Sequence, residues 1–307
     1  MRYSGIGGQA VMEGVMMKNK DQYAVAVRKP DGEIIVDKNV YRGILPDTKI
    51  KKTPFIRGVL NFIESLTLGM KTLMYSASFF EEEPETRKKQ DTKKSGQNKE
   101  SAVMGMTMAV SVLAAVVLFM LIPYLISTLF QKWIASQIVV SILEGVLRMA
   151  IFLGYILLIS RLEDIQRVFM YHGAEHKCIN CIEHGMELNV ENVRKSSRLH
   201  KRCGTSFLFL VVCISIIFFL FIRTDSGLMR IVVRLLLVPV IAGCAYELIR
   251  LAGRSDCIWI RLISMPGMAL QKLTTKEPDD DMIEVGIASV EAVFDWEAYI
   301  REKEDLP

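Results

Sequence analysis

Residues 102–131 read AVMGMTMAVSVLAAVVLFMLIPYLISTLFQ, a stretch in which no side chain carries a charge. A helix of about 20 apolar residues crosses the hydrocarbon core of a membrane, because each residue adds roughly 1.5 Å to its length. Pro123 lies near the end of the stretch, and membrane helices tolerate a proline. The stretch therefore predicts a membrane-spanning helix and decides the class of the protein.

Three later segments have a similar character. Residues 137–160 carry Glu144 and Arg148, which are four positions apart and therefore share one face of a helix, where they can pair. Residues 204–222 carry no charge. Residues 229–251 have charged residues near both ends and a proline inside, so they form either a fourth span or a re-entrant segment. The sequence predicts about four transmembrane helices.

Lysine and arginine are distributed unevenly between the spans. Residues 1–101 hold 18 of them, the turn after the first span holds only Lys132, and the loop of residues 161–203 holds eight. Cytoplasmic loops of membrane proteins carry the excess of positive charge. We therefore expect a multi-pass protein of the cell membrane with both termini and the loop 161–203 in the cytoplasm, and with the lipid bilayer as its first partner.

The overall composition excludes several other classes of protein. The chain of 307 residues is 51% hydrophobic, which is too much for a disordered protein. Its net charge of +4 does not indicate nucleic-acid binding, and we expect no nucleic-acid partner. Six cysteines are too few for a disulfide scaffold, and thiols facing the cytoplasm remain reduced.

Two regions outside the spans also have recognisable patterns. Residues 23–28 and 33–36 flank the turn sequence Lys29-Pro-Asp-Gly32 and predict one β-hairpin. Apolar residues recur every three or four positions after Pro54, which predicts a helix that lies either in a core or on the membrane surface. The acidic C-terminal tail predicts one amphipathic helix. The expected fold is an all-α polytopic membrane protein with a small cytoplasmic α+β N-terminal region, divided into residues 1–80, a charged linker 81–101, a membrane domain 102–253 and a cytoplasmic tail 254–307.

The loop 161–203 contains all four histidines and three of the six cysteines. His172 and His176 are four positions apart, so a helix places both imidazoles on one face, where they can bind a metal. Glu175 is near them and can act as a ligand or as a general base; His-x-x-Glu-His is also the pattern of the inverzincin peptidases. His200 is a candidate third ligand.

Two other interpretations of this loop remain open. Cys178-x-x-Cys181 followed by His200-x-x-Cys203 has the spacing of a structural zinc ribbon. Alternatively, the histidines cap helices and pair with nearby glutamates, and the cysteines are small buried residues without a metal.

A glycine-rich segment at residues 5–17 contains Gln9 and Glu13, and the helix after Pro54 begins with Arg57. Glycines allow a backbone to approach a ligand closely. These three polar residues, together with Lys177 and Arg202 of the loop, are further candidate site residues. An ordinary packed turn explains the glycines equally well.

Five stretches of the chain resemble those of a known family. They are Gly7-Gly-Gln-Ala-Val-Met-Glu-Gly-Val-Met-Met17, Pro54-Phe-Ile-Arg-Gly-Val59, Tyr171-His-Gly-Ala-Glu-His-Lys177, Arg198-Leu-His-Lys-Arg-Cys-Gly-Thr-Ser-Phe207 and Pro266-Gly-Met-Ala-Leu-Gln-Lys-Leu-Thr-Thr-Lys-Glu-Pro-Asp279. Together they resemble the YqhQ-like bacterial membrane proteins, a family of unknown function whose members carry the label of predicted metal-dependent enzymes. The family pattern centres on His172, Glu175, His176, His200 and the run from Arg202 to Ser206. It does not include Cys178 and Cys181, and Lys201 stands where the family pattern has proline.

The resemblance favours the histidine site over the zinc ribbon. It implies that His172, His176 and His200, with Cys203 as a further candidate ligand, hold a divalent metal such as zinc. Our first functional hypothesis is a metal-dependent hydrolase at the cytoplasmic membrane face with Glu175 as its general base. The alternative is a non-enzymatic membrane protein that binds or assists other membrane proteins and contains a structural metal site.

Overall fold

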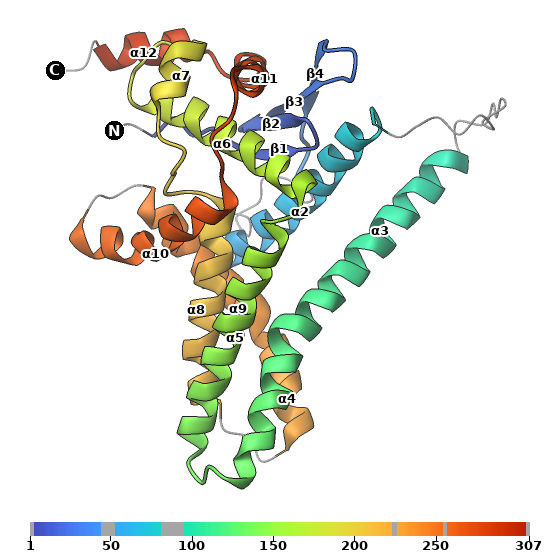
Figure 1. Ribbon diagram of the computed structural model, residues 1–307, viewed down its shortest axis with the longest axis vertical. Coiled ribbons are helices and arrows are strands. Elements are labelled where there is room, and N and C mark those ends of the chain that lie inside the picture. The colour runs from blue at the N-terminus through green and yellow to red at the C-terminus, as the bar shows by residue number, and fades with distance from the viewer. Residues whose placement is uncertain (1–2, 44–52, 81–94, 223–225, 254–256, 305–307) are drawn as a thin grey trace. The chain divides into compact units, whose positions relative to one another are not determined.

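The computed structural model describes residues 3–43, 53–80, 95–222, 226–253 and 257–304. The chain divides into two compact units (Figure 1). The first comprises Met1–Phe80, Ile156–Val211 and Pro239–Pro307, and the second comprises Glu81–Tyr155 and Val212–Val238. The predicted linker 81–101 lies outside the described residues as far as residue 94, after which helix α3 (Ser95–Val116) begins.

The N-terminal residues form a four-stranded antiparallel sheet in the order β1-β2-β3-β4. Its strands are β1 (Gly7–Val11), β2 (Gly14–Asn19), β3 (Gln22–Arg28) and β4 (Ile34–Val40). The predicted hairpin is confirmed as β3 and β4, in which Arg28 pairs with Ile34, and Gly32 adopts a φ of 89° in the connecting turn. The sheet is larger than the single predicted hairpin, because the glycine-rich segment also forms strands β1 and β2.

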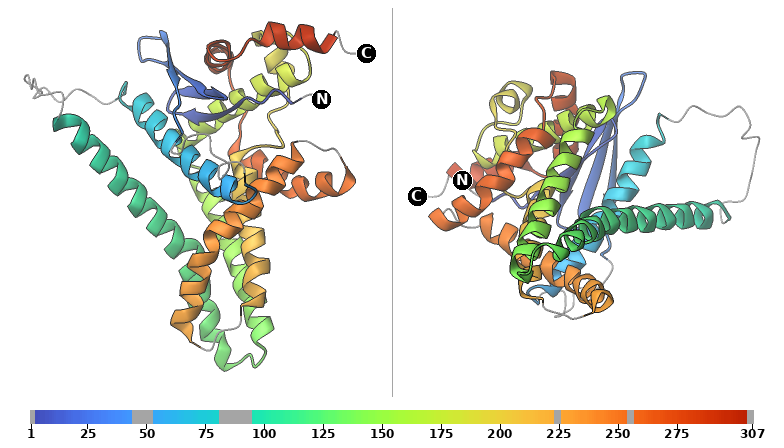
Figure 2. Two further views of the ribbon diagram at one scale, coloured as in Figure 1. Left: turned by 180° about the vertical axis from the view of Figure 1, so that it is seen from behind. Right: turned by 60° about the horizontal axis from the view of Figure 1, so that its bottom comes forward.

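Helices cover both faces of the sheet in the first unit (Figure 2). Side chains of β2 and β3 that point to one face pack against α6 (Glu163–Glu183) and α11 (Asp280–Glu291). The side chains of the other face, including Val11 and Val25, pack with Leu68 of α2 (Ile56–Ala77). The α+β region therefore includes helices from the middle and the end of the chain, which the hydrophobic pattern of the first 80 residues could not reveal.

The predicted helix after Pro54 is confirmed as α2, and one of its faces packs against the sheet. Leu68 is buried against the sheet, whereas Ile63 and Leu66 are exposed. Near its N-terminus, Asn61 donates a hydrogen bond of 2.6 Å to the hydroxyl of Tyr246. This contact attaches α2 to the C-terminal half of α9 (Gly227–Ala252).

In the part of the chain that the structure describes, four helices are long and apolar enough to cross a membrane: Gly105–Lys132, Gln137–Ile159, Gly204–Phe221 and Gly227–Ala252. The first comprises part of α3 (Ser95–Val116), the π-helical η1 (Val117–Leu121), α4 (Ile122–Leu129) and η2 (Phe130–Lys132), and the others are α5, α8 and α9. Pro239 lies inside α9 without ending it, so the uncertain fourth segment is one continuous helix.

A buried group of charges lies inside the second unit. Glu144 and Arg148 form the predicted ion pair at 2.7 Å, and Arg234 donates two further hydrogen bonds to the same carboxylate, at 2.7 and 2.8 Å. All three side chains are buried. Because an unpaired charge is costly among apolar helices, this shared carboxylate holds both arginines in place.

The C-terminal region contains more helix than the single amphipathic one predicted for it. Its helices are α10 (Ile258–Thr274), α11 and α12 (Trp296–Glu304). Asp279 caps α11 by accepting a hydrogen bond of 2.9 Å from the backbone N–H of Met282. A short helix, α7 (Val190–Lys195), follows α6 in the loop region.

Candidate metal centre

Helix α6 carries the histidine motif, and its sequence explains why it is helical there. Glu163 and Asp164 lie in its first turn, where negative charge favours the helix dipole. Gly173, an unfavourable residue inside a helix, lies where the chain after α10 crosses α6, and a Cβ atom at this position would collide with the carbonyl of Lys276. His172, Glu175 and His176 are therefore held on a helix whose second half is buried.

Each of the two histidines is oriented by a backbone carbonyl. Nδ1 of His172 lies 2.9 Å from the carbonyl oxygen of Thr274, and Nδ1 of His176 lies 2.6 Å from that of Arg198. A carbonyl only accepts, so both Nδ1 atoms carry the proton. In the neutral ring each Nε2 atom then offers a lone pair, and a hydrogen bond from the other ring nitrogen to a carbonyl is what orients metal-binding histidines in proteins.

Cys203, immediately before α8, completes a cluster of three potential ligands. Its Sγ lies 3.2 Å from Nε2 of His172 and accepts a hydrogen bond of 3.3 Å from the backbone N–H of Thr205. The ligand atoms of His172, His176 and Cys203 all lie within 4.8 Å of one another. A tetrahedral zinc site, with bonds of about 2.0 Å to nitrogen and 2.3 Å to sulfur, separates its ligand atoms by roughly 3.3 to 3.7 Å. The ligand atoms therefore need to approach one another by no more than about 1.5 Å to hold such an ion.

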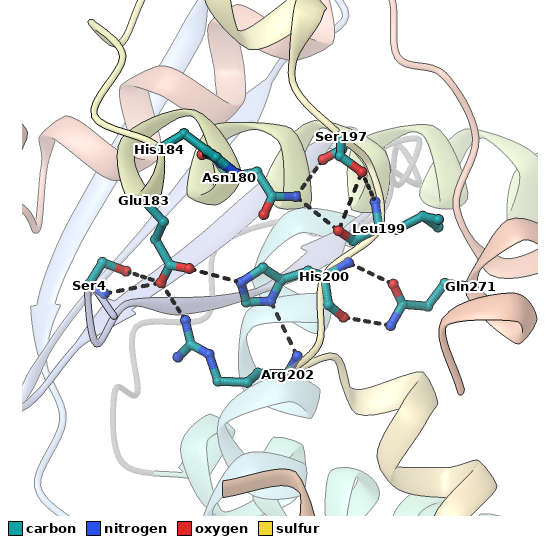
Figure 3. Close-up of polar contacts among 9 residues, drawn as sticks. All are labelled: Ser4, Asn180, Glu183, His184, Ser197, Leu199, His200, Arg202 and Gln271. Atoms are coloured by element: carbon teal, nitrogen blue, oxygen red, sulfur yellow. Dashed lines mark hydrogen bonds and ion pairs between the residues drawn. The ribbon is translucent and has the colours of Figure 1, made fainter. Parts of the chain in front are cut away.

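His200 lies beside this cluster with both ring nitrogens occupied (Figure 3). Its Nε2 is 3.4 Å from Oε2 of Glu183, and its Nδ1 accepts from the backbone N–H of Arg202 at 3.4 Å. Burial lowers the pKa of His200, which favours the neutral ring. Its ring centroid is 5.8 Å from that of His176. In this geometry its ring nitrogens do not join the cluster, and its role as a ligand stays a prediction.

Glu183 anchors the N-terminal segment beside the cluster. Its Oε1 accepts hydrogen bonds from the backbone and hydroxyl of Ser4, at 3.0 and 2.8 Å, and from Arg202 (Figure 3). Burial alone would raise the pKa of this carboxyl, but the hydrogen bond from His200 and the charge of Arg202 lower it to about 2. The guanidinium of Arg202 also lies 3.8 Å from the ring of Tyr3. Arg202, a predicted site residue, thus helps to close the site.

Amide side chains hold the segment that leads to Cys203. Gln271 of α10 accepts from the backbone N–H of His200 at 2.9 Å and donates to its carbonyl at 2.7 Å and to the hydroxyl of Ser206 at 2.8 Å. Asn180 donates to the carbonyls of Ser197 and Leu199. Sequence reasoning missed both amides, although Asn180 follows His176 by four positions and so shares its helix face.

The candidate base, Glu175, is buried between α6 and β1. Its Oε2 is 4.0 Å from Nε2 of His172. Burial raises the pKa of the carboxyl, and the backbone N–H of Gly8 opposes that shift. Gly8 is required here, because a Cβ atom on it would come within 2.9 Å of Cγ of Glu175.

A pocket of about 370 Å³ opens onto the cluster. One side of the pocket is formed by the candidate ligands and Glu175, and the rest by N-terminal residues and basic side chains. The lining includes His172, Glu175, His176, Cys203, Gly5, Gly7, Gln9, Lys18, Lys20 and Arg202. Three other candidates lie elsewhere in the structure. Glu13 pairs with Arg167, Arg57 pairs with Glu247, and Lys177 donates to the carbonyls of Arg194 and Ser196.

The zinc-ribbon cysteines lie in the core rather than at the cluster. Cys178 and Cys181 are fully buried, and Sγ of Cys181 contacts the carbonyl of Glu187 at 3.3 Å. Burial raises the pKa of both thiols, that of Cys181 to about 11. Among the described residues, the geometry therefore brings the histidine pair to Cys203 and not to these two cysteines.

Two comparisons place the chain among known proteins. Residues 53–296 match the family model described as a protein of unknown function (DUF1385). The chain is 36% identical over 304 residues to the uncharacterized protein YqhQ of Bacillus subtilis (strain 168), covering 97% of this chain and 95% of the relative. No solved structure matches the chain. The sequence resemblance is thereby confirmed: the chain belongs to the DUF1385 family and is related to YqhQ over nearly its whole length.

Proposed function

We propose that the protein is a metal-dependent hydrolase of the cytoplasmic membrane face, in which His172, His176 and Cys203 hold a divalent metal and Glu175 acts as general base. One observation carries the proposal. Three ligand atoms converge within 4.8 Å at the wall of a pocket that also contains a buried carboxylate. Two imidazoles and a thiolate form a donor set that suits zinc.

The number of available donors favours a catalytic site over a structural one. Structural zinc sites use four protein ligands, whereas catalytic sites use three and leave a position for water or substrate. The nearest additional candidate, His200, already has Glu183 and Arg202 as partners. The pocket beside the three donors supplies the space that a substrate needs.

Residues of the chain would have distinct roles in such a reaction. A bound metal would polarise the susceptible bond and make a water more acidic. Glu175 would take up the proton, and its raised pKa moves it towards the range in which a general base is effective. Thr274 and Arg198, through their carbonyls, keep the two imidazoles in the tautomer that binds metal.

The cytoplasmic location is part of the same proposal. It is supported by the 18 lysines and arginines that precede the first apolar helix, compared with only Lys132 in the turn that follows it. Cys203 directly precedes α8, so a membrane-spanning α8 would place the site next to the membrane surface.

A single membrane preparation can test the catalytic role of Glu175. Glu175→Gln preserves the shape of the side chain and removes its basicity, so we expect the variant to keep its metal and to lose the ability to complement a deletion strain. The exposed Glu187 provides the matched control, and Glu187→Gln should behave as the wild type. Full complementation by Glu175→Gln with metal bound would contradict the hydrolase and favour a binding protein with a structural metal.

A second variant tests whether the substrate binds in the pocket. A Cβ atom on Gly7 meets no other atom within 4 Å, so Gly7→Leu fills open space without disturbing the packing. We expect this variant to fold and bind metal but to lose function, because the leucine occupies the substrate's volume. Normal function in this variant would show that the pocket does not bind the substrate.

A further inference from the structure

Helix α10 presents an apolar face that the described part of the chain leaves largely exposed. Ile258, Trp259, Leu262, Ile263 and Met265 are between 47% and 72% exposed. On a helix, positions 258, 262 and 265 form one stripe, and 259 and 263 lie beside it. Large exposed apolar stripes on proteins indicate a contact with a partner or a membrane.

The opposite face of α10 is packed against the beginning of α8. Gly267, Leu270, Gln271 and Thr274 are buried. A Cβ atom on Gly267 would lie 2.9 Å from the side chain of Ser206, and Gln271 donates a hydrogen bond to the Ser206 hydroxyl. The packing therefore fixes α10 at the third residue of α8.

The contact with Ser206 indicates the depth of α10 along the membrane normal. Helix α8 begins at Gly204 and α9 ends at Ala252, and both helices are long and apolar enough to span. Because α10 contacts Ser206 and starts at Ile258, shortly after α9 ends, it lies where two spans leave the hydrocarbon core. Tryptophan prefers this interfacial zone, and the exposed Arg261 and Lys272 suit anionic headgroups.

We propose that α10 is an interfacial helix whose apolar face is inserted into the surface of an anionic lipid bilayer. Its inner face simultaneously holds the candidate metal centre. The carbonyl of Thr274 orients His172, and Gln271 binds the backbone of His200. The lipid surface thus supports the helix that positions the site, whether or not the site is catalytic.

Fluorescence of a single tryptophan tests the insertion directly. The chain has three tryptophans, and Trp133→Phe with Trp296→Phe leaves only Trp259. The full-length variant is reconstituted into vesicles of phosphatidylcholine and phosphatidylglycerol whose acyl chains carry bromine, which quenches tryptophan on contact. We expect Trp259 to lose most of its emission when the bromine is close to the headgroup, and less when it is at the end of the acyl chain.

A second variant provides the matched control. Trp133→Phe with Trp259→Phe leaves Trp296, which packs against the core of the first unit and should keep its emission in every lipid. Quenching of Trp259 should also be unchanged when the protein is diluted in lipid, since a second copy is not involved. Two results would overturn the proposal. Unquenched emission typical of water would mean that the face is solvated, and unquenched emission typical of a buried ring would mean that protein covers it.

Discussion

Replacing Gln271 by leucine tests how the candidate metal centre is held together. The side chain is fully buried, and leucine has a similar volume, so the change removes hydrogen bonds without opening a large cavity. It leaves the backbone N–H and C=O of His200 without their partners. Each buried unsatisfied group costs about 1 to 3 kcal/mol, so we expect a loss of roughly 2 to 6 kcal/mol in the free energy of unfolding. Ser206 can bond to a helix carbonyl instead and adds little.

The same change should weaken metal binding. Gln271 holds the segment that leads to Cys203, and loss of a group that orients ligands typically lowers metal affinity about 10- to 100-fold. Chelator competition and thermal unfolding of detergent-purified protein measure both effects. Lys272→Leu, at the exposed neighbouring position, is the control and should match the wild type. A Gln271→Leu protein with wild-type stability and wild-type metal affinity would refute this account of the site.

Two further predictions concern the apolar helices. Glu144→Leu leaves Arg148 and Arg234 buried without their shared carboxylate and should lower the free energy of unfolding by about 3 to 5 kcal/mol, whereas Arg148→Leu leaves Glu144 paired with Arg234 and should lower it by less. Heat denaturation in detergent measures both variants, and an Arg148→Leu protein less stable than Glu144→Leu would contradict this explanation. Reporter fusions after Lys132 should lie outside the cell and fusions at Pro307 inside, and an external Pro307 would rule out four spans with a cytoplasmic N-terminus.

Features set by local sequence could be predicted. Long uncharged runs, the Lys29-Pro-Asp-Gly32 turn and the four-residue spacing of His172 and His176 act within one element, so the corresponding helices and hairpin appear where the patterns indicate. Residues 7–19 were harder to recognise as strands. Their glycines and methionines lack the alternation of apolar and polar residues that marks a half-buried strand, because both faces of this sheet are covered by helices.

The composition of the site depends on contacts between distant segments. Spacing along the chain cannot show that Glu183 and Arg202 occupy the ring nitrogens of His200, or that Cys203 reaches His172. It also cannot show that Arg57 is used to join α2 to α9 through Glu247. Such pairings follow from the packing of α6, α10 and the start of α8 and from the contact of α2 with α9, which only the folded chain defines.

Metal analysis of the purified protein tests the central claim most directly. The account predicts one divalent ion per chain in the wild type, retention of that ion in the double variant Cys178→Ser and Cys181→Ser, and its loss in Cys203→Ser and in His176→Ala. The reason is that the core cysteines lie apart from the cluster whose ligand atoms fall within 4.8 Å of one another. Loss of the ion in the core-cysteine variant, with retention in Cys203→Ser and His176→Ala, would contradict the account.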